Sequence, residues 1–498
     1  MCKYWLNLDF LYIFIANMSE IVLSKENIVG RRAQIEALEK FLNTGSSEFI
    51  ALYGRRRVGK TYLVKEALRN CLLLHFTGRE GAPLNSQLLN FHYAIVDAGG
   101  SDSIPRNWTE AFRLLSKFLE KSTNKTKVVF IDELPWLDTP KSGFLGALEY
   151  FWNNWASYRN DIKLIVCGSA TSWMLDKVIN SRGGLHNRVT HKMLINPFTL
   201  KETEEYFESK DFAYNRGELM ECYMAFGGVP YYLSLLEREK SVAQNINDLC
   251  FVRGGELDGE YGRLFKSLFK KPTRHSSVIE ALSNKGIGMT RQEIIDSVGF
   301  VNNGNVTTML RELEECDFVR SYTPFGKNTK DKLYQLVDQY TMFYSRFIKG
   351  KRNFSKNYWL KQLSTSAYST WCGIAFEKVC LHHLDQITAA LGISGIVSEA
   401  CSWSYRAKPG EKGRGAQIDL LIDRNDKVVD VCEMKYYRDE YEITKDYYSI
   451  MQKRIDTFKR ETKTKKSVVP VFITSYGLHN NSYARKIPQS ITMDALFE

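Results

Sequence analysis

The sequence predicts an α/β protein with several domains. Three observations predict this class: a glycine-rich loop joins a buried strand to a helix, an apolar strand ends in two adjacent acids, and apolar strands that carry acids recur in the last third of the chain. The 498 residues are enough for roughly three domains of about 150 residues each. The net charge of +11 permits a polyanionic partner without proving one.

The chain begins with an apolar N-terminal extension, residues 1–18, which Asp9 interrupts. The apolar run is too short to span a bilayer and lacks the cleavage site of a signal peptide. We interpret it as an upstream extension of a cytosolic protein, and an interfacial anchor is the alternative. The ten cysteines are scattered without a C-x-x-C pair, which is typical of reduced proteins. We therefore predict a cytoplasmic protein with no membrane partner.

Residues 54–61 match the phosphate-loop pattern G-x-x-x-x-G-K-[S/T]. The loop comprises Gly54, Arg55, Arg56, Arg57, Val58, Gly59, Lys60 and Thr61. Its glycines let successive N–H groups point at phosphates, Lys60 supplies a positive charge, and the Thr61 hydroxyl is placed to ligate Mg²⁺. A strand at 49–53 and a helix at 62–68 flank the loop, so a helix N-terminus faces the phosphate. We predict ATP and Mg²⁺ as cofactors and expect the three arginines to face solvent.

Residues 127–133 predict a buried strand that ends in Asp132 and Glu133. Asp132 would hold Mg²⁺ and Glu133 would orient and polarise the attacking water. A further strand at 163–169 ends in Ser169, which would contact the γ-phosphate or the water, or would cap the next helix. Arg188 follows: it is either an arginine finger for the transition state or part of a surface ion pair. A finger usually acts from a neighbouring subunit, so the first role would imply a homo-oligomer.

The middle of the chain predicts a helical segment at 201–262 and then three helices followed by a hairpin, a winged-helix pattern, at 263–345. The third of these helices offers Asn305, Thr307, Thr308 and Arg311 to DNA, but three nearby glutamates, beginning at Glu312, oppose phosphate binding. DNA contact and a purely structural role both stay open. A basic linker at 346–369 with interleaved aromatic residues would either track nucleic acid or anchor itself by its aromatic side chains.

Five segments occur in a characteristic order: 27–31, 54–61, 130–137, 167–169 and 227–233. Together they resemble the archaeal-type P-loop ATPases, relatives of the AAA+ and STAND ATPases that are also found in Bacteroidetes. The resemblance covers roughly residues 20–350. It implies an ATPase core at 19–200, a helical lid at 201–262, and Gly228 and Pro230 near the adenine. From the residues alone, this Gly-Gly-x-Pro segment is only a turn before a helix.

The last third carries acids on apolar elements. Glu377 lies in a helix that we expect to begin near Gly373, Asp419 in a strand at 415–422, and Glu433 with Lys435 in a strand at 428–435. Alternation along a strand places Glu433 and Lys435 on one face, which we expect to meet Asp419 across a hairpin. Buried acids are costly unless they bind a ligand or pair with a cation.

These positions are similar to the PD-(D/E)XK restriction-endonuclease-like fold, which often follows archaeal-type ATPases, and the similarity covers residues 370–498. It implies that Asp419 and Glu433 bind Mg²⁺, that Glu377 assists, and that Lys435 orients the water or stabilises the phosphate. A structural ion-pair cluster is the alternative. Gln452 and Lys453 on the following helix are further candidates.

The predicted fold is therefore a P-loop core with a helical lid, a winged-helix domain and a C-terminal restriction-endonuclease-like α/β domain. The predicted function is an ATP-hydrolysing switch coupled to a DNA-directed, metal-dependent nuclease-like domain. The alternative is a signalling or scaffold ATPase whose C-terminal domain binds nucleic acid or protein without cutting. The predicted partners are ATP and DNA. If Arg188 acts as an arginine finger, a second copy of the chain is a further partner.

Overall fold

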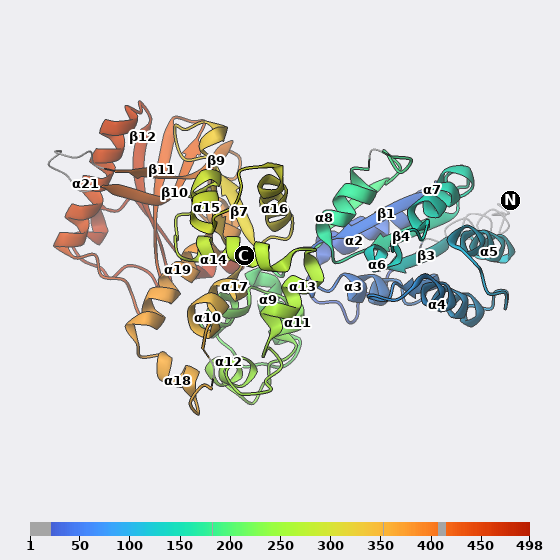
Figure 1. The fold of residues 1–498 in the computed structure, drawn as a ribbon. Coiled ribbons are helices and arrows are strands. Elements are labelled where there is room, and N and C mark those ends of the chain that lie inside the picture. The colour runs from blue at the N-terminus through green and yellow to red at the C-terminus, as the bar shows by residue number, and fades with distance from the viewer. Residues whose placement is uncertain (1–20, 182, 352, 407–414) are drawn as a thin grey trace, which may run out of the picture. The chain divides into compact units, whose positions relative to one another are not determined.

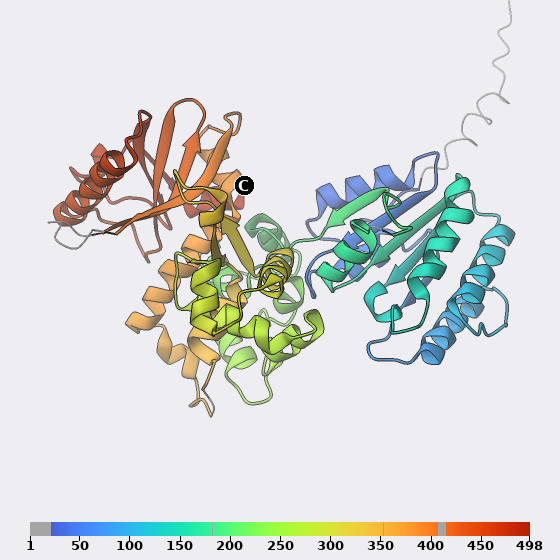
Figure 2. The ribbon, with the colours of Figure 1, turned by 45° about the horizontal axis from the view of Figure 1, so that its top comes forward.

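The structure is a computed structural model that describes residues 21–498, except residues 182, 352 and 407–414. The predicted N-terminal extension therefore lies outside the described residues. The chain divides into two compact units, Met1–Asn196 and Pro197–Glu498, which can be followed by colour in Figures 1 and 2.

The first unit is built on a parallel five-stranded sheet whose order is β2-β3-β4-β1-β5. The strands are β1 (Glu48–Tyr53), β2 (Leu72–Thr77), β3 (Lys127–Asp132), β4 (Ile162–Cys167) and β5 (His191–Leu194). β3, β4 and β1 are the inner strands, and β3 and β4 are buried along their whole length, as expected for strands covered on both faces. The strands predicted at 49–53, 127–133 and 163–169 are confirmed to within two residues.

Helices cover both faces of this sheet (Figure 2). On one face lie α2 (Arg32–Leu42) and α3 (Lys60–Ala67), and on the other α4 (Leu84–Asp97), α5 (Trp108–Lys121) and α7 (Phe144–Asn154). Short elements follow the strands: α6 (Leu134–Leu137), η1 (Ala156–Tyr158), α8 (Thr171–Trp173) and the π-helical turn η2 (Met174–Ile179). The two hydrophobic layers hold the sheet so that the carboxyl ends of β1, β3 and β4 meet at one edge, where ligands bind in open α/β sheets.

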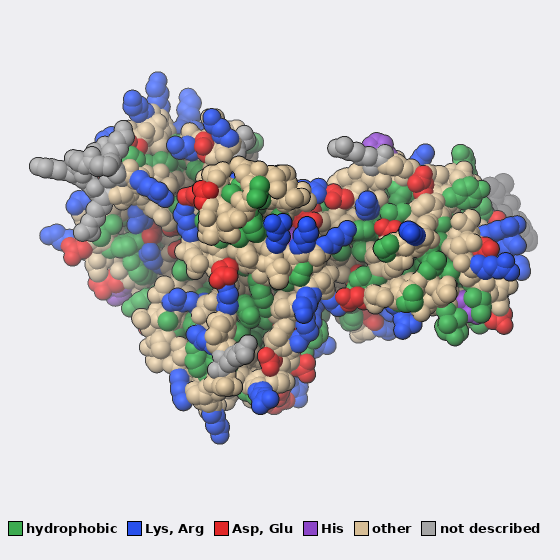
Figure 3. Space-filling view, viewed as in Figure 1, with side chains coloured by type: hydrophobic (Ala, Val, Ile, Leu, Met, Phe, Trp, Pro, Cys, Tyr) green, Lys and Arg blue, Asp and Glu red, His purple; other side chains and the backbone are tan. Residues whose placement is uncertain are grey.

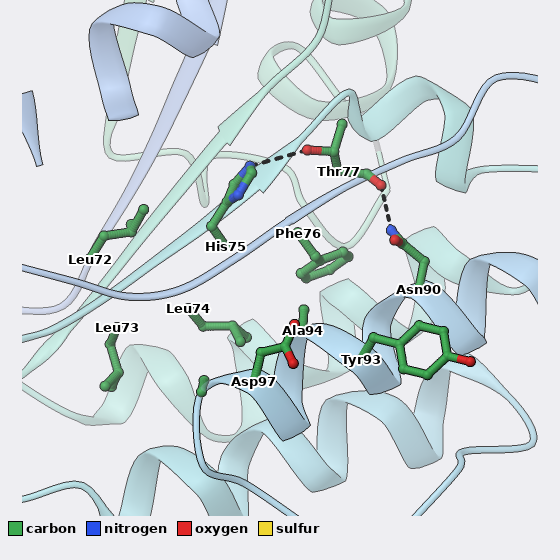
Figure 4. A pocket seen from close by; sticks show the side chains of 11 residues that line it. Leu72, Leu73, Leu74, His75, Phe76, Thr77, Asn90, Tyr93, Ala94 and Asp97 are labelled. Atoms are coloured by element: carbon green, nitrogen blue, oxygen red, sulfur yellow. Dashed lines mark hydrogen bonds between the residues drawn. The ribbon is translucent and has the colours of Figure 1, made fainter. Parts of the chain in front are cut away.

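A cleft lies along β2, one of the two edge strands of the sheet, and α4 forms its second wall (Figure 4). Asn90 donates to the Thr77 carbonyl at 2.7 Å, and the Thr77 hydroxyl lies 3.1 Å from His75 Nε2. Burial lowers the pKa of His75 to about 4, so the imidazole is neutral at ordinary pH. We assign no function to this cleft.

The second unit begins with the helices α9 (Leu200–Glu208), α10 (Arg216–Phe226), α11 (Pro230–Leu233) and α12 (Val242–Cys250). The predicted turn before Pro230 needs a glycine because the backbone packs closely there. Gly228 has φ 65°, and a Cβ on it would lie 2.2 Å from the Phe198 carbonyl oxygen. Only glycine fits this position without movement of the backbone.

The next segment has the element order of a winged helix (Figure 1). It contains α13 (Glu260–Leu268), α14 (Pro272–Ser283), β6 (Met289–Thr290), α15 (Arg291–Val298), α16 (Gly304–Glu315), β7 (Val319–Tyr322), η3 (Thr329–Asp331) and β8 (Leu333–Leu336). The strands pair in the order β6-β8-β7, and Thr290 caps α15 in a capping box with Glu293.

The predicted basic linker is largely folded against the second unit. It begins within the π-helical turn η4 (Tyr344–Ile348), which follows α17 (Gln339–Phe343), and it contains α18 (Tyr358–Gln362). Phe347 and Trp359 are 2% and 1% exposed and pack in the main core of the unit. These aromatic side chains are therefore anchors, as one of the two sequence interpretations holds, and they are not available to stack on nucleic acid bases.

The C-terminal part is a mixed sheet with the order β13-β12-β11-β10-β9. Its elements are α19 (Ser366–His382), α20 (Leu384–Ala390), β9 (Ser398–Tyr405), β10 (Ala416–Arg424), β11 (Val428–Lys435), α21 (Lys445–Thr462), β12 (Ser467–Thr474), η5 (Ala484–Lys486), β13 (Gln489–Thr492) and η6 (Met493–Phe497). α19 packs on one face through the main core, and α21 packs on the other. The helix that carries Glu377 begins at Ser366, and Gly373 lies in its interior, so the start predicted near Gly373 is wrong.

No helix within residues 21–498, apart from the gaps given above, is long and apolar enough to cross a membrane. The nine cysteines of the described residues are free thiols, and eight of them are buried.

The glycine that opens the phosphate loop should be essential for stability. Gly54 has φ 135°, and a Cβ on it would lie 2.3 Å from the Ile195 carbonyl oxygen. We expect Gly54→Ala to destabilise the first unit by about 1–3 kcal/mol, the range for strained backbone. Gly146→Ala, in the exposed part of α7 where a Cβ meets nothing within 4 Å, is the control and should be neutral or stabilising. Thermal unfolding followed by circular dichroism measures both, and equal melting temperatures would contradict the prediction.

Candidate functional site

The phosphate loop connects β1 to α3 and turns at two glycines, Gly54 and Gly59, whose φ angles are 135° and 86°. Lys60 Nζ donates to the Gly54 and Arg55 carbonyls, each at 2.8 Å, and Lys60 is 5% exposed. These carbonyls offset the cost of burying the ammonium group and hold it over the loop. The loop thus has the conformation that the sequence pattern predicts.

A side chain from outside the loop also fixes its shape. Arg31, the N-cap of α2, donates from Nη2 to the Val58 carbonyl at 3.0 Å and is 5% exposed. In the sequence, Arg31 is only the last residue of the segment 27–31, and nothing there signals this contact. Of the three loop arginines, Arg55 is 3% exposed, so the prediction that all three face solvent is wrong.

Asp132 joins three elements at the carboxyl edge of the sheet. Its Oδ2 accepts from the Thr61 hydroxyl at 2.9 Å, and its Oδ1 accepts from the Cys167 thiol at 2.6 Å and from the Glu133 N–H at 3.0 Å. Burial raises the pKa of Cys167 well above its ordinary value, so the thiol keeps its proton and donates. Asp132 thereby ties the phosphate loop to β3 and β4.

Glu133 is held in position by Ser169. The Ser169 N–H and hydroxyl donate to Glu133 Oε2 at 3.0 Å and 2.9 Å. The pKa of Glu133 is raised, mainly by burial and in smaller part by the Asp132 charge. The Ser169 N–H and the Lys60 charge act in the opposite direction. The first residue before α8 is Ala170, so the alternative that Ser169 caps this helix is wrong. An oriented carboxylate with a raised pKa suits a general base.

Thr61 and Asp132 fit a magnesium ion, because a hydroxyl and a carboxylate oxygen lie side by side at the end of the loop and both are hard ligands. These two residues would hold Mg²⁺, which when bound neutralises charge on the transferred phosphate. Lys60 and the loop N–H groups would bind the remaining phosphate oxygens.

For two further predicted site residues, Arg188 and Pro230, the structure gives only the local position. Arg188 is exposed on the turn that follows Leu185, where its N–H donates to the Leu185 carbonyl at 3.1 Å. Pro230 is the first residue of α11 in the second unit. The roles of Arg188 as a finger and of Pro230 at the adenine remain predictions.

A second cluster of charged side chains lies on β11 and α21. Glu433 Oε1 lies 2.7 Å from Lys435 Nζ, and Glu433 Oε2 lies 2.6 Å from Arg454 Nη1. The Tyr447 hydroxyl also donates to Glu433 Oε1. Burial opposes the charge of Glu433, but Lys435 and Arg454 outweigh it and lower the pKa of Glu433. The predicted common face of Glu433 and Lys435 is confirmed.

Asp419 does not lie on that face. β10 carries a bulge between Ile418 and Leu421, so that two of its residues oppose Ser402 of β9. Ile418 and Leu421 both pack on the α21 side, whereas Leu420 packs on the α19 side. The bulge therefore turns Asp419 toward α19, where it lines a small crevice with Arg320, Tyr322, Leu381 and Ser402 among its walls. The expectation that Asp419 meets Glu433 and Lys435 on one face is wrong for this reason.

Glu377 and Lys378 of α19 lie in the field of Asp419. Burial, and then the Asp419 charge, raise the pKa of Glu377 to about 7, although Lys378 and Lys435 oppose the shift. Lys378 is 3% exposed, and its Nζ donates to the Gly286 carbonyl of the winged-helix segment at 3.2 Å. Burial lowers the pKa of Lys378. Acids and a lysine are thus concentrated here, as at many functional sites.

The second cluster as folded does not fit a divalent cation bound jointly by Asp419 and Glu433. Both Glu433 oxygens already accept from cations, Asp419 Oδ1 accepts from the Gln417 amide at 2.6 Å, and the two carboxylates point to opposite faces. Among the described residues, no three His, Cys, Asp or Glu side chains are grouped so as to hold a metal ion.

The sequence does not identify Tyr447 and Arg454 as partners of Glu433. Tyr447 and Arg454 are seven residues apart on α21, which places them on one helix face. That spacing is the signal that could have found them. Of the candidates predicted on this helix, Gln452 and Lys453, the second is exposed. Lys and Arg side chains also gather on the surface of the part of the second unit where α21 and β12 lie (Figure 3).

The raised pKa of Glu377 predicts a pH-dependent cost to stability. In the unfolded chain the carboxyl group ionises near 4.5, and in the folded chain near 7, so the folded state must keep it protonated or bear its charge. The cost grows from pH 4.5 to pH 7 and is complete above pH 7. Glu377→Gln should therefore stabilise the protein at pH 8, by at most about 3 kcal/mol, with most of this gain lost at pH 5.

The control for this measurement is Glu442→Gln, which changes an exposed carboxylate. Denaturant unfolding at pH 5 and pH 8 gives the free energy of unfolding for each variant. A stabilisation by Glu377→Gln that is equal at both pH values would contradict the prediction.

Comparisons with known proteins agree with the geometry of the phosphate loop. Residues 28–236 match the family described as an ATPase domain predominantly from Archaea. Over 457 residues the chain is 27% identical to the uncharacterized protein MJECL04 of Methanocaldococcus jannaschii, which amounts to 86% of this chain and 96% of that protein. A 42-residue stretch is 50% identical to the uncharacterized ATP-binding protein MJ0423 of the same organism, covering 8% of this chain and 71% of that protein.

Among solved structures, the Walker-type ATPase PABY2304 of Pyrococcus abyssi aligns with a TM-score of 0.49 and 17% identity, over 65% of this chain and 97% of that chain. The family match spans the phosphate loop, Asp132, Glu133 and Ser169. Through residues 28–236 the chain belongs to the P-loop ATPases found predominantly in Archaea, and it binds and hydrolyses ATP.

Proposed function

We propose that this ATPase is a switch that controls a DNA-directed C-terminal domain. The observation that carries the proposal is the Glu433–Lys435 pair on β11, which faces a helix rich in exposed cations. The exposed Lys and Arg residues of α21 and of the residue that follows it are Lys445, Lys453, Lys459, Arg460 and Lys463. Such a surface favours the phosphate backbone of nucleic acid.

The order of the C-terminal elements supports a nuclease-like fold. A helix (α19), an antiparallel β9–β10–β11 meander, a helix (α21) and a parallel strand (β12) follow one another, and they carry Glu377, Asp419, Glu433 and Lys435. This is the arrangement that the resemblance to PD-(D/E)XK nucleases implies. The similarity to MJECL04 runs through both units, which supports a joint function of ATPase and C-terminal domain.

In the ATPase, Lys60 and the loop N–H groups bind the phosphates, Thr61 and Asp132 hold Mg²⁺, and Glu133 accepts the proton of the attacking water. The geometry that supports these roles is the bonding of Thr61 to Asp132 and of Ser169 to Glu133. Arg188 is the residue we propose as a finger on the nucleotide of a neighbouring copy, and Pro230 as an adenine contact.

The ion pairs favour a C-terminal domain that binds DNA without cutting it, because Arg454 and Lys435 occupy both oxygens of Glu433. Metal-dependent cutting is the second candidate. It is favoured by Glu377, whose pKa is raised by burial and then by the Asp419 charge, because a bound cation would stabilise both carboxylates. Cutting would require Glu433 to leave Arg454.

A plasmid assay separates the two candidates. The full-length chain is incubated with supercoiled plasmid in Mg²⁺ or Mn²⁺, with and without ATP, and binding and nicking are both measured. We expect DNA binding that depends on ATP and is altered in Lys60→Ala, which should hydrolyse ATP at least about a hundredfold more slowly. Nicking that is lost in Asp419→Ala but kept in the exposed control Asp456→Ala would establish cutting. No DNA binding under any condition would refute the proposal.

Ser169 should set the pH dependence of ATP hydrolysis. Its hydroxyl stabilises the Glu133 carboxylate, so Ser169→Ala should raise the pKa of Glu133 further. Glu133 then stays protonated, and cannot act as a base, up to a higher pH. We expect the acid limb of the rate profile to move to higher pH, with a rate at pH 6 about fivefold below wild type, the factor for one hydrogen bond. Ser157→Ala, which removes an exposed hydroxyl from η1, is the control. A uniform loss at all pH values would contradict this role.

A further inference from the structure

One face of α16 in the winged-helix segment is polar and open. Gly304, Thr307, Thr308 and Arg311 are exposed at the spacing i, i+3, i+4, i+7, which is one helix face. The opposite face packs in the core of the segment through Val306, Met309, Leu310 and Leu313. The exposed face is extended at its beginning by Asn302, Asn303 and Asn305.

The acids of α16 each lie beside a basic side chain, which weakens the opposition to phosphate that the sequence predicts. Glu312 Oε2 lies 2.7 Å from His275 Nε2, Glu314 lies 3.4 Å from Lys332 Nζ, and Glu315 lies 3.8 Å from Arg311 Nε. The lysine and the arginine offset part of the repulsion that the three glutamates exert on phosphate.

Cations surround the beginning of this face. Arg291 of α15 donates to Asn302 Oδ1 at 2.7 Å and to Thr307 Oγ1 at 3.1 Å. Arg274 of α14 stacks over Phe300, just before α16, at 4.9 Å. Lys270 and Lys271, next to α14, are exposed. The contacts of Arg274 and Arg291 place positive charge on the two helices that flank the start of α16.

We propose that α16 reads double-stranded DNA from the major groove and that Lys270, Lys271 and Arg274 bind the flanking phosphates. Asn, Thr and Arg on one exposed helix face are the side chains that contact base edges, and a helix fits the major groove of B-form DNA. The excess of positive charge beside the helix complements the phosphate backbone. This inference rests on the proposed direction of the protein toward DNA and assigns that contact to a site separate from the Glu433 cluster.

The test is a charge placed on the open face. Thr308→Glu should weaken binding of the full-length chain to a fluorescent 30-base-pair DNA duplex by about tenfold or more, in the presence of ATP. The matched control is Thr370→Glu on α19. Thr308 and Thr370 are both exposed, and each hydroxyl donates to the carbonyl four residues earlier, at 3.2 Å and 2.8 Å. The control should bind like wild type, and both variants should keep wild-type ATP hydrolysis.

Three further measurements sharpen the assignment. Lys271→Ala should lower the slope of log affinity against log salt by about one, as the loss of one phosphate contact does. A duplex RNA of the same sequence should compete poorly, because its major groove is too narrow to admit a helix. Asn305→Ala should change the base preference that is found by sequencing the bound fraction of a randomised duplex pool.

The outcomes separate this inference from the proposed function. If the chain binds DNA but Thr308→Glu and Thr370→Glu bind equally well, or if duplex RNA competes as well as DNA, the assignment to α16 is overturned and DNA binding stands. If the wild-type chain binds no DNA, the proposed direction toward DNA fails together with it.

Discussion

The carboxylate of Asp132 is the point on which the arrangement of the ATPase site depends. Parallel strands bring the carboxyl ends of β1, β3 and β4 to one edge of the sheet. Side-chain contacts then connect the loops that follow these strands. Asp132 supplies that junction, because it accepts hydrogen bonds from Thr61 after the phosphate loop and from Cys167 at the end of β4. A buried carboxylate without such donors would be costly, so the donors and the acid stabilise one another.

The two acidic sites of the chain stabilise their buried carboxylates with different kinds of partner. In the ATPase site, neutral donors satisfy Asp132 and Glu133, which leaves their negative charge available to a metal ion and a water. In the C-terminal domain, full positive charges satisfy Glu433, and Asp419 is turned away by the bulge in β10. The acids of the first site lie together at one edge of the sheet, whereas those of the second point to opposite faces.

Sequence reasoning succeeds where local pattern and chemistry coincide. The phosphate loop, the paired acids after β3 and the wing of the winged helix are each encoded within one short segment, so their elements are predicted to within a few residues. It fails where position depends on a single added residue or on distant packing. The bulge at Asp419 shifts one residue to the opposite face, and strict alternation cannot reveal it. The contact of Arg31 with Val58 and the burial of Arg55 likewise arise from tertiary structure.

The contact of Lys378 with the Gly286 carbonyl has a consequence for the evolution of the chain. The ammonium group of a core lysine in the C-terminal domain is satisfied by a backbone atom of the winged-helix segment, and Tyr322 and Ser402 bond across the same boundary at 3.0 Å. Recombination that exchanged the C-terminal domain alone would leave this lysine charge without its acceptor. The winged-helix segment and the C-terminal domain are therefore expected to be inherited as one module.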